Sequence, residues 1–189
     1  MTIAISKFTK ITGWLIALLL MAFGTASFAE DAEQRAEIDA AADAAIVKMF
    51  DEDRRAERLS KDAIAILVFP EITKAGLGIG GEGGKGVLRV GGESTAYYKT
   101  TSISFGAQAG FQKYSYVLFF YDQAALDKFR SKRGYELGVD GSVAILEAGV
   151  TADIDTSDLR RDMVGIVFNE SGLMANATVE GSKLTELDI

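Results

Sequence analysis

The sequence contains no cysteine and no histidine, and these two absences exclude much of standard enzyme chemistry. Without cysteine the chain has no disulfide framework, no thiolate metal site and no cysteine nucleophile. Without histidine it has no Ser-His-Asp triad, no HExxH metalloprotease site and none of the commonest ligand of zinc, copper and haem. A single proline and 48% hydrophobic residues, in a chain of 189, are typical of one packed domain rather than a disordered or collagen-like protein.

The first 29 residues have the order of a secretory signal peptide. Two lysines are their only charges, an apolar run extends from Trp14 to Phe23, and small residues lead to Ala29. The run is shorter than the roughly 20 residues that a membrane span needs. We therefore predict cleavage after Ala29 and a single domain over residues 30–189, located in a bacterial periplasm or secreted.

The charge balance argues against nucleic acid as a partner. The whole chain has a formal net charge of −7, and loss of the two leader lysines leaves 18 basic and 27 acidic residues, a net charge of −9. An acidic protein of this kind is a poor non-specific ligand for a phosphate backbone. Binding to an anionic membrane requires a local basic patch that acts against the net charge.

Residues from Glu30 to about Arg58 are predicted to form a helix, because the segment is rich in alanine, glutamate and arginine and contains no glycine or proline. Four apolar residues share one helical face, which Phe50 widens: Ile38, Ala42, Ala45 and Met49. We interpret this face as packed on a protein core. The alternative is an amphipathic helix that docks on lipid, although its polar face is acidic where such helices carry lysine and arginine.

From Ala63 onward the sequence predicts mostly β-strands. Residues 63–69 are apolar throughout, as in a strand covered on both faces, and Pro70 is expected to end this strand. A glycine-rich segment over residues 76–92 follows, in which Gly91 and Gly92 predict a hairpin turn. The remaining predicted strands are 87–90, 95–98, 102–112, 114–121, 138–150, 163–168, 173–179 (joined to the preceding strand at 169–172) and a short one near Leu184.

A second helix, Gln123–Arg130, is predicted among the strands, capped by Asp122 and with Leu126 and Phe129 on its apolar face. Residues 59–62 either start a short helix of their own or lead into the first strand, and residues 151–162 are predicted to be an exposed loop. A helix followed by antiparallel strands with one inserted helix is the pattern of an α+β domain. We expect an N-terminal helix packed on a mostly antiparallel, glycine-rich β-sheet or barrel-like sandwich.

The glycine-rich segment contains a GxGxxG pattern between Gly76 and Gly81. A dinucleotide site needs a helix to open at this point so that its N-terminus faces the pyrophosphate, whereas here more glycine and then a strand follow. The pattern also fails as a Walker A loop, because Gly86 follows Lys85 where serine or threonine is required. We favour close backbone packing or a strongly bent strand as the reason for these glycines.

Carboxylates are plentiful, but no pattern places two of them together as a catalytic pair. They include Glu71, Glu82, Glu93, Asp140 and Glu147. A hydrolase built on Asp140 is therefore kept only as a third hypothesis. One local basic cluster, from Lys128 to Arg133, lies at the end of the second predicted helix, where cations either complement the helix dipole or bind phosphate.

Four blocks of the sequence, in order, resemble the SYLF-domain family, and the resemblance extends from about Ile38 to the end of the chain. The blocks are Phe69–Gly81 with Gly83 and Gly86, Ser102–Gln112, Gly138–Ala144, and Gly172–Ala175 with Glu180–Leu184. Asn176 departs from the pattern, since a glycine is expected there. The resemblance implies a lipid-binding module without catalytic activity. Eukaryotic members are associated with phosphoinositides and actin, and bacterial members are typically exported single-domain proteins.

The sequence and the resemblance together predict a monomeric or weakly oligomeric, non-enzymatic module that binds phospholipid at a membrane surface of the bacterial envelope. No cofactor and no metal are expected, and actin is not an expected partner in a bacterial periplasm. Cations are predicted to pair with lipid phosphates, and glycine N–H groups to form an anion-binding nest. The predicted lipid-binding residues are Lys74, Lys85, Lys128, Arg130, Lys132 and Arg133. The alternative is a periplasmic protein-interaction or envelope-stress module that binds a protein partner and no lipid.

Overall fold

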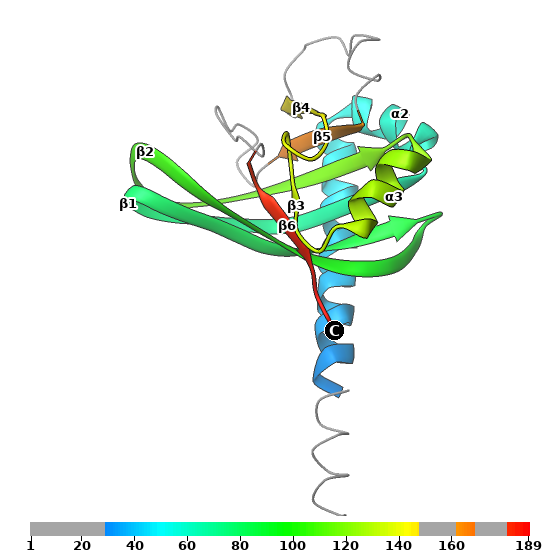
Figure 1. Ribbon diagram of the computed structural model, residues 1–189, viewed down its shortest axis with the longest axis horizontal. Coiled ribbons are helices and arrows are strands. Elements are labelled where there is room, and N and C mark those ends of the chain that lie inside the picture. The colour runs from blue at the N-terminus through cyan, green and yellow to red at the C-terminus, as the bar shows by residue number, and fades with distance from the viewer. Residues whose placement is uncertain (1–28, 148–161, 169–180) are drawn as a thin grey trace, which may run out of the picture. The chain divides into compact units, whose positions relative to one another are not determined.

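The computed structural model describes residues 29–147, 162–168 and 181–189 (Figure 1). The chain divides into a short N-terminal unit that ends at Glu37 and a compact unit over Ile38–Asp188. Residues 29–37 of the first unit are helical. All the buried core side chains of the described residues lie between Ile38 and Leu184, so a chain that starts at Glu30 contains this whole core.

Residues 38–52 of the compact unit are helical, and their apolar face is buried as predicted. Ile38, Ala42, Ala45 and Met49 have exposed fractions between 0% and 7%. The face is therefore occupied by the core, which confirms the interpretation as a packed helix. None of the helices among the described residues is long and apolar enough to cross a membrane.

The prediction of one helix as far as Arg58 is wrong in its last part, because the helix is interrupted at Asp53. Asp53 is the N-cap of a separate helix, α2 (Arg54–Asp62), and its carboxylate accepts a hydrogen bond of 2.8 Å from the Arg55 backbone N–H. The same carboxylate pairs with the Arg55 guanidinium. An aspartate that satisfies an orphan N–H in this way starts a new helix rather than continuing the old one.

Strands β1 (Ala65–Val90) and β2 (Glu93–Phe120) form one long antiparallel hairpin. Its turn is Gly91-Gly92, as predicted, and both residues have positive φ angles, 60° and 90°. Such angles suit glycine and match the twist of the flanking strands. The expectation that Pro70 ends the first strand is wrong. β1 continues past it because the ladder is irregular between Phe69 and Ile72, and β1 pairs only with β2 among the described strands.

The remaining described strands extend this hairpin into a six-stranded sheet with the order β3-β6-β2-β5-β4, in which β1 pairs with β2. They are β3 (Tyr135–Glu136), β4 (Val143–Glu147), β5 (Met163–Phe168) and β6 (Lys183–Glu186). Only the β4–β5 pair is parallel among these strands. The predicted strand at 173–179, Asn176 and all but the last residue of the predicted loop at 151–162 lie outside the described residues. The α+β class is confirmed.

The β1–β2 ribbon bends back on itself at the glycine-rich segment. Figure 1 shows this bend at the end of the hairpin beside the labels β1 and β2. A Cβ atom on Gly84 would lie 2.2 Å from the Glu71 carbonyl oxygen. One on Gly86 would lie 2.3 Å from the Val68 carbonyl oxygen. These glycines let two parts of the same strand pack against each other, so close backbone packing is confirmed as their role.

Helix α3 (Gln123–Ser131) covers the aromatic part of the core. Asp122 caps it as predicted, since its carboxylate accepts a hydrogen bond of 3.1 Å from the Ala125 backbone N–H. Phe129 on α3 is fully buried, and its ring lies 4.9 to 5.2 Å from the rings of Tyr98, Phe120 and Tyr135. Burial raises the pKa of Tyr98 to about 12, so this hydroxyl stays neutral at ordinary pH.

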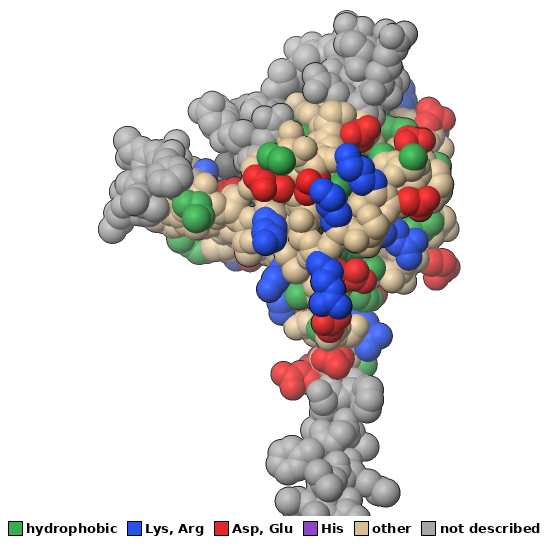
Figure 2. Space-filling view, viewed as in Figure 1, with side chains coloured by type: hydrophobic (Ala, Val, Ile, Leu, Met, Phe, Trp, Pro, Cys, Tyr) green, Lys and Arg blue, Asp and Glu red, His purple; other side chains and the backbone are tan. Residues whose placement is uncertain are grey.

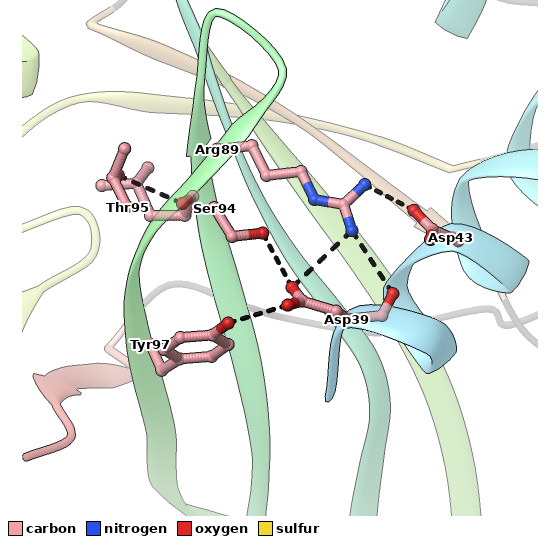
Figure 3. Close-up of polar contacts among 7 residues, drawn as sticks. Asp39, Asp43, Arg89, Ser94, Thr95 and Tyr97 are labelled. Carbon is pink, nitrogen blue, oxygen red and sulfur yellow. Dashed lines mark hydrogen bonds and ion pairs between the residues drawn. The ribbon is translucent and has the colours of Figure 1, made fainter. Parts of the chain in front are cut away.

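A polar network joins the helix over 38–52 to the hairpin (Figure 3). The carboxylate of Asp39 accepts hydrogen bonds of 2.7 Å from Ser94 Oγ and 2.8 Å from Tyr97 Oη. Arg89 lies between two helical acids. Its guanidinium donates to Asp43 at 2.6 Å and to the Asp39 carbonyl at 3.3 Å. The network therefore ties one turn of the helix to both strands of the hairpin next to their turn.

We expect Asp39→Ala to lower the free energy of unfolding by about 1–3 kcal/mol. The substitution removes two hydrogen bonds to the hairpin and the ion pair between the Asp39 carboxylate and Arg89. Asp43→Ala should cost less than about 1 kcal/mol, since the Asp43 side chain is 67% exposed and makes one contact. Urea unfolding of both variants measures the difference. Equal losses would show that the network does not depend on Asp39.

Candidate functional site

The structure separates Lys74 from the other predicted lipid-binding residues. Lys74 and Glu82 are eight positions apart on β1, yet the bend brings Lys74 Nζ to 3.8 Å from Glu82 Oε2. Ser102 Oγ also donates to Glu82, and burial together with the Glu82 carboxylate raises the pKa of Tyr114. The side chains of Lys74 and Glu82 are only 25% and 7% exposed. Lys74 therefore belongs to a polar cluster inside the bend.

Lys85 lies instead on an exposed basic face of the sheet, which we call the outer basic face and define as Lys85, Lys99 and Lys183. Lys85 is directly opposite Lys99 in the β1–β2 ladder. Thr101, two residues after Lys99 on β2, is directly opposite Lys183 of β6. Opposite residues, and residues two apart on one strand, point to the same side of a sheet, so the three ammonium groups share a face. Glu136 of β3, opposite Lys183, is the acid on that face.

The α3 cluster, which is Lys128, Arg130, Lys132 and Arg133, is exposed at the end of α3 and in the turn before β3. Lys183 lies beside this turn, because a Cβ atom on Gly134 would be 2.6 Å from Lys183 Cε. Figure 2 shows Lys and Arg side chains, with some acids among them, on the side of the molecule where β6 and α3 lie in front. Lys183 thus connects the outer basic face with the turn that carries Lys132 and Arg133.

One member of the α3 cluster is already paired. Lys132 Nζ donates to Asp140, whose other carboxylate oxygen accepts a hydrogen bond of 2.9 Å from the Glu136 backbone N–H. The hydrogen bonds from Lys132 and Glu136 hold the pKa of Asp140 below its ordinary value. A carboxylate with both oxygens engaged and a lowered pKa closes a turn and is poorly suited to act as a general acid.

The structure thus brings five of the six predicted residues to neighbouring surfaces and leaves Lys74 inside the bend. Sequence reasoning missed Lys99 and Lys183, which complete the outer basic face. The alternation of Tyr98, Lys99 and Thr100 does indicate that Lys99 is exposed, since Tyr98 and Thr100 on either side are buried, with exposed fractions of 2% and 3%. No local pattern indicates that Lys183 lies beside it, because β6 joins the sheet from the far end of the chain.

The predicted glycine nest is not formed in the described part of the segment. Residues 76–86 are extended and pair with β2, except at the irregularity between Leu77 and Ile79. The described glycines with positive φ angles are Gly91, Gly92, Gly138 and Gly181. A nest needs successive N–H groups that converge on one point, whereas a ladder directs them alternately to the two sides of the strand. Among the described residues, no acidic cluster is grouped so as to hold a metal ion.

Comparison with known proteins finds one family. Residues 101–188 match the model of the family described as Ysc84, Las17-binding protein actin regulator. No curated protein matches the chain. The matched residues include three of the four blocks that resemble SYLF domains, while the block at Phe69–Gly81 lies before them. The family is one of binding domains and is not known for catalysis. The match over residues 101–188 supports membership of the Ysc84, or SYLF-domain, family.

Proposed function

We propose that this chain is a phospholipid-binding module that works at a membrane surface of the bacterial envelope. The observation that carries the proposal is the outer basic face, because three lysines from three different strands are exposed side by side on an acidic protein. Such local positive charge attracts an anionic surface by roughly 1 kcal/mol for each lysine near it. The adjoining α3 cluster extends the same attraction around the edge of the sheet.

Family membership agrees with a binding role but leaves the ligand open. The structure also removes one competing route to lipid, since the apolar face of the helix over 38–52 is covered by the core. Lipid binding through that face would require the helix to leave the sheet and break the Asp39 network. Contact through exposed lysines requires no such rearrangement, and it should weaken as salt screens the charges.

The test is flotation of residues 30–189 with neutral and anionic phospholipid vesicles across a salt series. Lys99→Glu with Lys183→Glu should weaken binding to anionic vesicles more than about tenfold, because two attractions become repulsions. Lys48→Glu with Lys61→Glu is the matched control: it changes the net charge equally, and these lysines pair with Glu52 and Glu57 on the helices.

Equal losses in both pairs of variants would show that net charge, and not the outer basic face, controls the affinity. Absence of binding to any vesicle at low salt would reject the proposal. It would move the protein-interaction module to first place, and saturable binding to an envelope protein would then be expected.

A further inference from the structure

Among the side chains that the structure describes at the bend of the β1–β2 ribbon, two large apolar ones are not covered by the core. We call this part of the ribbon the arm and define it as residues 75–81 and 102–112. Ile103 is 72% exposed and Phe111 is 63% exposed. Their cross-strand neighbours are small, Gly81 opposite Ile103 and Ala75 opposite Phe111. Neither side chain therefore has a large apolar partner directly across the ribbon, and both are exposed to water.

Charge is distributed around the arm in a way that suits a lipid surface. The sequence has no charged residue in 75–81 or in 100–112. Lysines border these stretches at 74, 99 and 113, Glu82 borders the fourth end, and Lys85 follows three positions later. Lys74 and Lys113 are paired with Glu82 and Glu71, so these four lysines and two glutamates keep a positive sum. Lys113 Nζ lies 5.8 Å from the centre of the Phe111 ring, which places a cation immediately behind an aromatic side chain.

We propose that the arm inserts into the interface of a phospholipid membrane, with Ile103 and Phe111 at the level where headgroups meet acyl chains. This inference rests on the proposed function and assigns its point of insertion. Apolar side chains gain by leaving water, while lysines behind them reach back to the phosphates. Within the arm, the ladder between β1 and β2 pairs the backbone groups on one side of each strand. Shallow insertion keeps the groups on the other side of both strands within reach of headgroups and water.

The lack of native cysteine permits a direct test. Single cysteines are introduced into residues 30–189 by Ile103→Cys and by Phe111→Cys, and each is labelled with an environment-sensitive nitrobenzoxadiazole dye. Val47→Cys and Val139→Cys are matched controls, because these side chains are 61% and 71% exposed elsewhere on the protein. Vesicles of phosphatidylcholine with phosphatidylglycerol should raise the dye emission at 103 and 111, and spin-labelled lipids should quench it there but not at 47 and 139.

A second pair of variants measures affinity instead of environment. Ile103→Ser with Phe111→Ser should weaken flotation about tenfold or more, whereas Val47→Ser with Val139→Ser should leave it unchanged. All four positions are exposed, so folding is preserved and circular dichroism checks it. Vesicle binding without a dye response at 103 and 111 would overturn the insertion and leave the proposed function standing. Absence of vesicle binding in the parent chain would overturn both.

Discussion

Gly86→Ala is expected to destabilise the protein by about 3 kcal/mol, although it adds only one methyl group. The new Cβ atom would lie 2.3 Å from the Val68 carbonyl oxygen and 2.7 to 2.9 Å from ring atoms of Phe69. A carbonyl oxygen within a paired strand cannot move without loss of ladder hydrogen bonds, so the two parts of β1 must separate. Urea unfolding of residues 30–189 measures the loss as a lower midpoint.

Gly81→Ala is the matched control, since it lies in the same strand and its nearest atom to a Cβ would be the Ser102 carbonyl oxygen at 3.9 Å. Alanine restricts the unfolded chain more than glycine does, and this substitution should be neutral or stabilising by up to about 1 kcal/mol. Equal midpoints for Gly86→Ala and Gly81→Ala would contradict the close packing of the bent ribbon.

Phe129→Ala is expected to cost about 3–5 kcal/mol, because it empties the centre of the aromatic part of the core. Its ring is fully buried and contacts the rings of Tyr98, Phe120 and Tyr135, which come from β2 and β3. For a domain of this size the loss corresponds to a melting temperature lower by roughly 6–20 °C. Calorimetry or thermal circular dichroism measures it.

Phe111→Ala, at an exposed position of the arm, provides the comparison. It should change the free energy of unfolding by less than about 1 kcal/mol, since Phe111 is 63% exposed and contributes only a surface cation–π contact. The two substitutions should therefore affect different properties: Phe129→Ala lowers the free energy of unfolding, and Phe111→Ala lowers the affinity for vesicles. A large loss of stability in Phe111→Ala would show that the arm is packed more tightly than its exposure indicates.

Local features of the fold were predictable because each depends on residues that are neighbours in sequence. The 3.6-residue spacing of Ile38, Ala42, Ala45 and Met49 identified the buried helical face. Gly91-Gly92 identified the hairpin turn. The break at Asp53 was missed, although an aspartate can begin a helix as well as lie inside one. Pro70 does not end β1, because an irregularity in the ladder accommodates it. The sequence of one strand does not reveal such an irregularity, since it depends on how the partner strand is aligned.

The candidate site was predictable only in part. The α3 cluster is contiguous in sequence, so its existence required no structure. Lys74 and Lys85 look similar in sequence, since both lie on β1 beside or within the glycine-rich segment. The bend distinguishes them by turning Lys74 toward Glu82 and leaving Lys85 next to Lys99. The exposed pair on the arm, Ile103 and Phe111, fitted an alternating strand and would have been assigned to a core on periodicity alone.

The amino-acid sequence is enough to predict most of the helices and strands, the acidic charge, the absence of thiol and imidazole chemistry, and the family resemblance. Each of these is a property of composition or of short spacing along the chain. The tertiary structure is needed to show that the ribbon folds back and packs Gly84 and Gly86 against the first part of β1. It also brings Lys183 to Lys85 and Lys99 and leaves Ile103 and Phe111 exposed. These features depend on strand register and on contacts between distant segments, for which one chain carries no local signal.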